Sequence, residues 1–541
     1  MTTDGAFTWG TEVRRREDGI PFLEYEPRRR RLPELFEDTA RWASRVHLVQ
    51  GERRITYRSL FQAVEGVATE LAARGVRPGD RVLLLAVNSP EWVVSFWGAL
   101  AVGAVMAPGN GWWSEEEAAH VVSRIEPALV IGDERGLAKL PGDSLPTMPC
   151  AEVAAIVDAA SASVDADPSA PVSLPGVAGE PADEDEDEAA LIVFTSGTTG
   201  FPKGAALAHR SILANMHDLM ARSRRLPHQI DPDRPGPVSL AMGPLFHIGG
   251  IQSLCLALVG GATLVFLEGR FDSTRVLDLI ETERVTVWGG VPTMARRVVE
   301  DPTLAGRDLT CVRSITLGGA PVPPEVVGRL RSAFPNADRG VSTVYGMTET
   351  GGTVASASGA LMVEHPGTSG RVQRLVDLRI AHPDATGEGE VLVRTPGQML
   401  RYWGEGAESD RVIDDEGFVH TGDLGRLSDG LLWITGRSKD VIIRGGENIA
   451  APRVEAILLE HPDVVEVAVV GLENADLGEE VGAAVLPRAG VDTGAEELAA
   501  FLRARLAHFE VPTRWWFTDE PLPTNEAGKV DKRSLKSKWP A

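Results

Sequence analysis

Short apolar segments alternate with helical segments along the first part of the chain, and this alternation limits the folds that the chain can adopt. Residues 56–75 have the spacing of an amphipathic helix that ends at a glycine. A buried strand over 81–86, a helix over 91–102 and a strand over 105–108 follow. The same rhythm resumes over 189–340. Strands that alternate with helices imply βαβ units and a largely parallel sheet.

The pattern changes in the last third of the chain. Short strands with many turns over 370–435 indicate a small antiparallel or distorted-barrel unit. A compact run of strands and helices follows, and about 105 residues can form a separate small domain. We therefore predict an α/β chain. Its large N-terminal part, 1–436, holds parallel αβαβα-type sheets and the small distorted β-barrel, and residues 437–541 form a smaller α+β C-terminal domain.

The charge balance excludes one class of partner. The formal net charge is −23, whereas a nucleic-acid binder needs a basic face. Any anionic ligand must therefore be held by local geometry. Four consecutive arginines at 28–31 are the exception, and we interpret them as a solvated arm or as local salt-bridge partners, with a membrane or nucleic-acid patch as the alternative. The acidic run at 183–188 ends a segment, 160–188, that we interpret as a solvated surface connection.

Cysteine usage and hydropathy favour a cytoplasmic location. The chain has three cysteines and no CxxC pair, which argues against a zinc site and a disulfide framework and fits a reducing compartment. The first residues lack the features of a secretory signal. The longest apolar runs, 96–109 and 254–267, are too short to span a bilayer, so we predict buried core elements and no transmembrane segment. The sequence leaves the oligomeric state open.

A glycine-rich polar loop follows the apolar run at 189–194. The stretch 195–204, TSGTTGFPKG, combines three glycines, four hydroxyl side chains and one lysine. Such a loop can cradle phosphates, because glycines let backbone N–H groups converge on an anion while the hydroxyls and the lysine complete the shell. The spacing is not that of the Walker loop. Phosphate binding on another scaffold and a simple surface turn therefore both stay open at this point.

Four further motifs follow in order: 345–349 (YGMTE), 420–423 (HTGD), 436–440 (GRSKD) and 523–529 (PTNEAGK). With these five motifs, the chain resembles the adenylate-forming superfamily of acyl-CoA synthetases, peptide-synthetase adenylation domains and luciferases. The resemblance runs from about Tyr57 to about Leu535, which is nearly the whole chain.

This resemblance implies two half-reactions with ATP, Mg²⁺ and coenzyme A. A carboxylate first attacks the α-phosphate of Mg-ATP, which gives an acyl adenylate and pyrophosphate. A thiol, usually that of coenzyme A, then displaces AMP and forms a thioester. A free carboxylate is a poor acyl donor, whereas AMP is a good leaving group.

The resemblance also implies roles for the motif residues. Thr348 is expected to hydrogen-bond the α-phosphate and Glu349 to hold Mg²⁺, a hard cation that prefers oxygen ligands. Lys529 is expected to reach the α-phosphate and the acid during adenylation, where a placed cation stabilises developing charge. The residues expected to wrap the β- and γ-phosphates are Thr195, Ser196, Gly197, Thr198, Thr199, Gly200 and Lys203.

The nucleoside is expected to contact a second group of residues. Asp423 would accept both ribose hydroxyls, with Arg437 donating nearby. Tyr345 would stack on the adenine, and Gly346 belongs to the same motif. The backbone expected beside the base is that of Gly318, Gly319 and Ala320, although three small residues are also compatible with tight packing.

The family moves its C-terminal domain between the two half-reactions. One pocket cannot hold Lys529 and the incoming thiol together, and domain rotation of this kind can limit turnover. The hinge position of the family corresponds to Lys439. After rotation, Gly445 and Gly446 would leave a slot for the pantetheine arm of coenzyme A.

The stretch 244–250, PLFHIGG, corresponds to a segment that lines the acyl pocket. Amino-acid-activating relatives carry an aspartate at the position of His247, so a free amino acid is not expected. We interpret His247 as a pocket wall and gate beside the acyl adenylate, with a general base as the alternative. Small and apolar residues favour a roomy pocket for a medium-chain, branched or cyclic acid. They are Gly249, Gly250, Gly289 and Gly290, with Trp288, Val291, Met347 and Gly319.

We therefore predict an AMP-forming acyl-CoA synthetase of fatty-acid or lipid metabolism that acts on a small carboxylic acid. No insertion marks 350–370 as it does in ligases that feed acyl carrier proteins, so coenzyme A is the favoured acceptor. An acyl-AMP ligase that loads an acyl carrier protein is the alternative. A non-catalytic nucleotide-binding module is a further alternative, and a luciferase-like oxygenase shares every motif.

Overall fold

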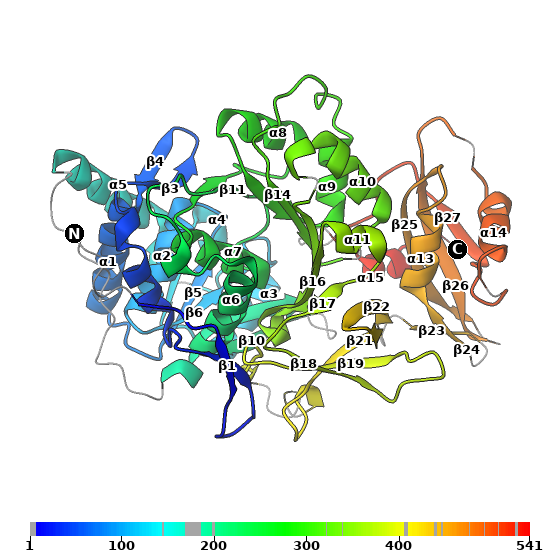
Figure 1. Ribbon diagram of the computed structural model, residues 1–541, viewed down its shortest axis with the longest axis horizontal. Coiled ribbons are helices and arrows are strands. Elements are labelled where there is room, and N and C mark those ends of the chain that lie inside the picture. Colours follow the sequence, from blue (N-terminus) through cyan, green and yellow to red (C-terminus); the bar gives the residue numbers. More distant parts are fainter. Residues whose placement is uncertain are drawn as a thin grey trace.

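The computed structural model describes most of the chain as an α/β structure with three large sheets (Figure 1). The described residues are 7–142, 145–167, 185–196, 201–320, 322–337, 339–404, 409, 411–437, 441–444, 447–474, 477–491, 493–506, 508–524 and 529–540.

A seven-stranded sheet lies in the N-terminal part and has the order β20-β10-β9-β6-β5-β7-β8. Its centre is parallel, as the alternation of strands and helices predicts, and β10 turns back antiparallel to β9. The strands are β5 (Arg81–Leu85), β6 (Val105–Pro108), β7 (Leu129–Gly132), β8 (Thr147–Pro149), β9 (Ala189–Ser196), β10 (Pro202–Ala208) and β20 (Arg401–Tyr402).

Helices separate this sheet from the next one. Helix α1 (Tyr57–Ala73) begins where the Thr56 side chain accepts the Ser59 N–H, and α2 (Pro90–Ala101) begins with a proline after Ser89. Every residue of α2 is buried, and one core joins it to strands of both sheets, so α2 lies between them. The predicted helices and strands of this region are confirmed.

A thirteen-stranded sheet changes from parallel to antiparallel at the pair β15–β16. The antiparallel strands that the sequence predicted are therefore hydrogen-bonded to the parallel ones in one sheet. The parallel side holds β3 (Val46–Gln50), β12 (Thr263–Phe266), β11 (Val238–Ala241), β13 (Val287–Gly290), β14 (Ser314–Gly318) and β15 (Val341–Met347), with β4 (Arg53–Thr56) at its edge. The antiparallel side holds β16 (Gly352–Ser358), β17 (Gly370–Val372), β22 (Leu431–Arg437), β21 (Val419–Ser428), β19 (Gly389–Arg394) and β18 (Asp377–Ala381).

The C-terminal part has a sheet and a core of its own and lies at one end of the molecule (Figure 1). Apolar residues of its strands and helices, among them Val454, Val469, Val481 and Leu498, form that core. The elements are β23 (Val441–Arg444), β24 (Glu447–Ala450), α13 (Ala451–Leu458), β25 (Val464–Asn474), β26 (Gly478–Pro487), α14 (Ala495–Arg503), β27 (Arg514–Phe517) and α15 (Lys532–Ser537).

Two expectations about the surface need correction. Helix α5 (Cys150–Ala166) continues into the segment expected to be a loop, because apolar residues such as Val157 and Val164 are buried at helical spacing. The acidic run is not fully solvated either. Glu186 is 5% exposed and forms ion pairs with Arg16, Arg28 and Arg30.

The salt-bridge interpretation of the four arginines at 28–31 is thereby confirmed for Arg30, which pairs with Glu186, and for two others. Arg28 pairs with Glu24 and Glu186, and Arg29 pairs with Asp38 at 3.1 Å. The side chains of both arginines are buried. The run therefore anchors an N-terminal segment to the body of the molecule.

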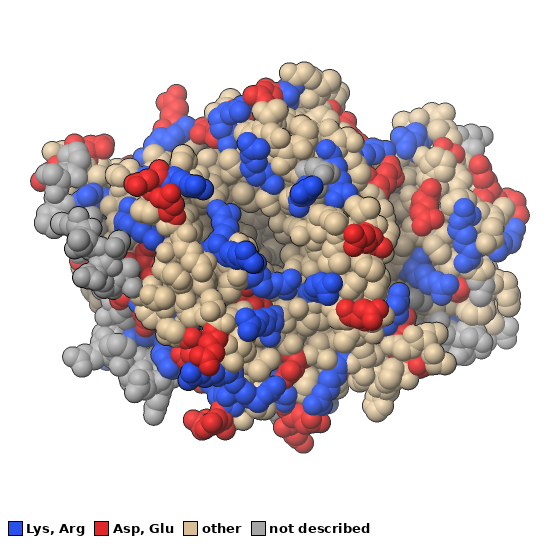
Figure 2. Space-filling view, in the orientation of Figure 1, with Lys and Arg blue, Asp and Glu red and all other residues tan. Residues whose placement is uncertain are grey.

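The remaining global expectations concern membranes, thiols and charge. None of the helices in the described ranges combines the length and the apolar character that crossing a bilayer would require. All three cysteines are free thiols. On the face shown in Figure 2, lysine and arginine side chains gather around a central hollow, although the chain carries a net charge of −23.

The buried ion cluster gives a prediction about stability. Glu186→Gln should lower the free energy of unfolding by about 3 kcal/mol, because it leaves buried arginines without full compensation. Glu12→Gln is the matched control, since Glu12 pairs with Arg14 while both side chains are 64–66% exposed. This control should cost less than about 1 kcal/mol. Urea denaturation measures both, and equal losses would contradict the role of burial.

Candidate active site

A buried carboxylate lies where two antiparallel strands meet the end of β15. Asp423 on β21 is 3% exposed and stands opposite Arg437 on β22. The Tyr345 hydroxyl donates to Asp423 Oδ2 at 2.7 Å, and Arg437 Nε donates to Oδ1 at 2.6 Å. Burial, followed by the Asp423 charge, raises the pKa of Tyr345 well above its usual value, so the hydroxyl keeps the proton that it donates. Each Asp423 oxygen still has a lone pair for a further donor.

The end of β15 and the turn that follows it both need glycine. A Cβ on Gly346 would lie 1.9 Å from the carbonyl oxygen of Gly352, so only glycine allows this close approach of β15 and β16. The turn η6 (Thr348–Thr350) follows and ends at Gly351, whose φ is +67°. This geometry places Thr348 and Glu349 directly beyond the strand that carries Tyr345.

Glu349 is a second buried carboxylate of the site, at 7% exposure. Its Oε1 accepts the hydroxyl of Tyr402 at 2.7 Å, and its carbonyl oxygen accepts the Met399 N–H. The motifs did not reveal Tyr402. The available signal was its rarity, because the chain has only four tyrosines.

The strands of the glycine-rich loop are fixed by their pairing. Lys203 on β10 stands opposite Thr195 on β9 and is 7% exposed. Its Nζ lies 5.9 Å from the centroid of the Tyr402 ring. The rest of the predicted loop, namely Gly197, Thr198, Thr199, Gly200 and the side chain of Ser196, lies outside the described residues.

Lys529 comes from the C-terminal part and reaches the same site. A Cβ built on Gly319, whose φ is +78°, would lie 3.4 Å from Lys529 Cε and 3.9 Å from its Nζ. The residue as a whole is exposed, but burial of its ammonium lowers its pKa. The charge of Arg437 lowers it further and that of Asp423 opposes the shift. The ammonium of Lys529 therefore lies close enough to the Asp423–Arg437 ion pair for both charges to act on it.

The small residues after β14 differ in what they contact. A Cβ on Gly318 would lie 2.7 Å from Val344 on the neighbouring strand, so tight packing explains this glycine. Gly319 leaves room for the approach of Lys529, and Ala320 is exposed. The hinge and slot positions, Lys439, Gly445 and Gly446, lie outside the described residues.

His247 immediately precedes helix α7 (Ile248–Val259). Burial, followed by the charge of Lys529, lowers its pKa to about 4. Its Nε2 is buried and has no hydrogen-bond partner among the described residues, and its ring packs on Phe246 with centroids 4.5 Å apart. A general base works best with a pKa near the working pH, so these features favour a pocket wall.

The expected acyl-pocket residues divide into two groups. A Cβ on Gly249 would meet nothing within 4 Å, and one on Gly290 would touch Met242 and Met294 at 3.3–3.4 Å. Gly250 and Gly289 instead allow close backbone contacts, at 2.3 and 2.5 Å from a built Cβ. The expectation that Trp288 lines the pocket is wrong. This side chain is 1% exposed and packs on Phe334 in a separate core.

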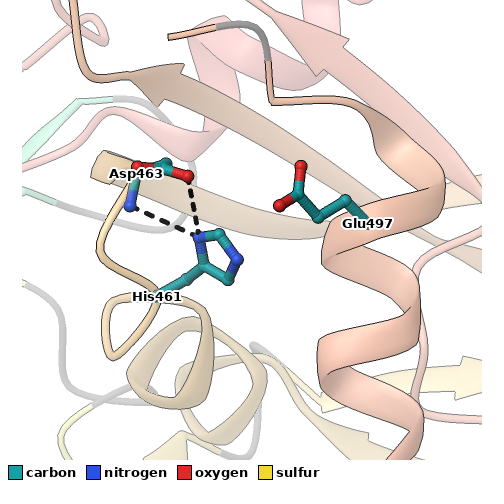
Figure 3. A group of neighbouring side chains, drawn as sticks. All are labelled: His461, Asp463 and Glu497. Carbon is teal, nitrogen blue, oxygen red and sulfur yellow. Dashed lines mark hydrogen bonds and ion pairs between the residues drawn. The ribbon is translucent and has the colours of Figure 1, made fainter.

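A histidine and two carboxylates gather elsewhere, in the C-terminal part (Figure 3). His461, Asp463 and Glu497 hold possible ligand atoms within 4.8 Å of one another. However, Nδ1 of His461 accepts the backbone N–H of Asp463, and the Asp463 carboxylate accepts the Thr493 hydroxyl. These bonds stabilise the turn between α13 and β25, and we assign the group a structural role.

Comparison with known families agrees with this geometry. Residues 35–403 match the AMP-binding enzyme family, and residues 453–529 match the AMP-binding enzyme C-terminal domain. The chain therefore belongs to the AMP-binding enzyme family, and the resemblance inferred from the motifs is confirmed.

Individual relatives cover nearly the whole chain. A feruloyl-CoA synthase of an Amycolatopsis species is 34% identical over 501 residues, which are 90% of this chain and 95% of the relative. The fatty acid–[acyl-carrier-protein] ligase ScoC of Streptomyces coeruleorubidus is 32% identical, with coverage of 90% and 92%. The crystal structure of ATP-bound MatB from Rhodopseudomonas palustris has a TM-score of 0.78 and 27% identity, over 94% and 99% of the chains. The predicted fold class is thus confirmed.

The pKa of His247 gives a prediction about acid stability. Its pKa of about 4 in the folded chain lies below the ordinary value of 6.5, so the unfolded chain binds more protons between these values. His247 therefore contributes a loss of stability as the pH falls from 6.5 to 4. His247→Gln should reduce that loss by up to about 3 kcal/mol. Unfolding measured at both pH values tests this, and an unchanged loss would contradict it.

Proposed function

We propose that the chain is an ATP-dependent, AMP-forming acid–thiol ligase. It activates an apolar carboxylic acid as an acyl adenylate, releases pyrophosphate and passes the acyl group to coenzyme A. The observation that carries this proposal is the convergence of Asp423, Glu349 and Lys529 near the ends of β14 and β15 in the large sheet. Membership of the AMP-binding enzyme family supports it.

In this proposal the nucleoside binds against Asp423. The lone pairs left on its two carboxylate oxygens suit the two hydroxyls of a ribose, and Arg437 donates from the same side. Tyr345 and Gly346 bring the adenine beside the turn, with Gly319 and Ala320 opposite. Thr348 would donate to the α-phosphate, and the glycine-rich loop with Lys203 would receive the β- and γ-phosphates.

The residues present also fit a magnesium ion. Glu349 offers a carboxylate, the ligand type that hard cations prefer, and only its Oε1 is engaged by Tyr402. Glu349 together with the phosphates of the substrate would hold Mg²⁺, whose charge would neutralise the departing pyrophosphate.

Lys529 acts in the first half-reaction. The acid's oxygen forms a bond to the α-phosphorus while the bond to the bridging oxygen of the β-phosphate breaks, and pyrophosphate leaves with that electron pair. The Lys529 ammonium stabilises the charge that develops at the α-phosphate. In the second half-reaction the thiol sulfur bonds to the acyl carbon and AMP leaves, so Lys529 must withdraw.

Withdrawal requires a movable C-terminal part. The sheet changes after Arg437, the last residue of β22, which lies one residue beyond the proposed boundary and supports a division of the chain there. Rotation about Lys439 would bring Gly445 and Gly446 to the site and leave a slot for pantetheine. A cytoplasmic location suits ATP, coenzyme A and three free thiols.

The proposed acid and acceptor follow from the glycines of the expected acyl pocket and from the relatives. The open space at Gly249 and the apolar contacts at Gly290 suit a medium-chain, branched or cyclic acid. The relatives named above are a feruloyl-CoA synthase and a fatty acid–[acyl-carrier-protein] ligase, so their names do not favour one acid class. The similarity to ScoC supports transfer to an acyl carrier protein as the second candidate.

Because Lys529 is proposed to act in the first half-reaction, its removal should impair that half-reaction selectively. Lys529→Ala should slow acid-dependent pyrophosphate release by about 100-fold to 1,000-fold, because a preorganised cation is lost. Thioester formation from pre-made acyl adenylate should persist. Lys532→Ala is the control, since Lys532 forms an ion pair with Glu455 at 2.7 Å within the C-terminal part. Equal loss of both half-reactions would overturn this assignment.

A second prediction concerns substrates. In a pyrophosphate-release screen, medium-chain, branched or cyclic acids should exceed short polar acids and free amino acids. With the best acid, thioester should form on free coenzyme A. Thioester formed only on an acyl carrier protein would instead favour the second candidate.

A further inference from the structure

Tyr402 links two groups of the site that lie far apart in sequence. Its hydroxyl donates to Glu349 Oε1 at 2.7 Å, and both residues are 7% exposed. Its ring lies 5.9 Å from the ammonium of Lys203, within the range of a cation–π contact. One side chain therefore contacts both the turn after β15 and the strand that follows the glycine-rich loop.

The backbone around Tyr402 is fixed to that strand. Tyr402 pairs with Ala205 across β20 and β10. The Trp403 N–H donates to the Gly204 carbonyl at 2.7 Å, and the Leu400 N–H donates to the Ala206 carbonyl at 2.8 Å. The phenol ring consequently has a defined position relative to the loop, which a residue on a free surface loop would not have.

The hydrogen bond restricts the Glu349 carboxylate. A hydrogen bond to a carboxylate is stronger than one between neutral groups, and a buried carboxylate without a donor is costly. With Oε1 held by the phenol, the side chain cannot rotate freely, and its position is set before any cation arrives. Such preorganisation raises affinity, because less freedom is lost on binding.

We propose that Tyr402 is a positioning residue that holds Glu349 in the orientation needed for the divalent cation that accompanies ATP. Its ring keeps Lys203 beside the same site. This inference rests on the proposed function, in which Glu349 holds Mg²⁺.

The chain contains a matched control for this role. The Tyr25 hydroxyl donates to Asp218 at 2.8 Å, and both residues are 2% exposed. The chemistry of the pair is the same, but Tyr25 lies in the N-terminal hairpin strand β2 (Leu23–Glu26) and Asp218 in helix α6 (His209–Ser223). Neither residue belongs to the motifs of the nucleotide site.

The experiment compares Tyr402→Phe with Tyr25→Phe in the full chain. Two quantities are measured: the Mg²⁺ concentration that half-saturates acid-dependent pyrophosphate release, and the binding of Mn²⁺ to the complex with a non-hydrolysable ATP analogue, followed by electron paramagnetic resonance. Tyr402→Phe should raise the half-saturating Mg²⁺ concentration about tenfold and weaken the binding of Mn²⁺ about tenfold. Tyr25→Phe should leave both unchanged. Thioester formation from pre-made acyl adenylate should be unaffected in either variant.

A double-mutant cycle separates positioning from general damage. In a Glu349→Gln background, Tyr402→Phe should add less than twofold to the Mg²⁺ requirement, because its effect acts through Glu349. Full additivity would overturn the inference, as would a lower turnover of Tyr402→Phe at an unchanged Mg²⁺ requirement. Wild-type activity that needs no divalent cation would overturn the magnesium assignment itself, and this inference with it.

Discussion

Two hydrogen bonds from tyrosine hydroxyls to buried carboxylates underlie the site. Tyr345 holds Asp423, and Tyr402 holds Glu349, each at 2.7 Å. Carboxylates buried without donors are costly, so the phenols stabilise both acids, together with Arg437 in the case of Asp423. The ammonium of Lys529 lies close enough to Asp423 for the charge of that carboxylate to act on it.

Much of the architecture could be predicted from local patterns. Helix α1 was expected over 56–75 and forms over Tyr57–Ala73, because its apolar spacing matches one helical face and Thr56 caps it. The C-terminal part was predicted as a compact α+β unit, because apolar strand and helix segments follow one another over about 105 residues. Site residues that share a motif, such as Thr348 and Glu349, could also be predicted to lie together, because they are adjacent in the sequence. Their neighbourhood is fixed by the chain itself.

Features that depend on distant partners could not be predicted. Glu186 belongs to an acidic run that is typical of a solvated loop, yet its partners Arg16 and Arg28 are 158–170 residues away. Trp288 is the buried residue of a strand whose other residues are partly exposed, and the local sequence does not indicate which face of the strand borders a pocket. Tyr402 meets Glu349 across 53 residues, and only the fold brings them together.

The central claim is that ATP is cleaved between its α- and β-phosphorus atoms while the acid is captured as a mixed anhydride. Exchange of labelled pyrophosphate into ATP tests it most directly, because that exchange requires the first half-reaction to be reversible and to depend on the acid. We predict exchange that starts only when an apolar carboxylic acid is added and that needs no thiol. Release of ADP in place of AMP, or no acid-stimulated exchange with any of the candidate acids, would contradict the account.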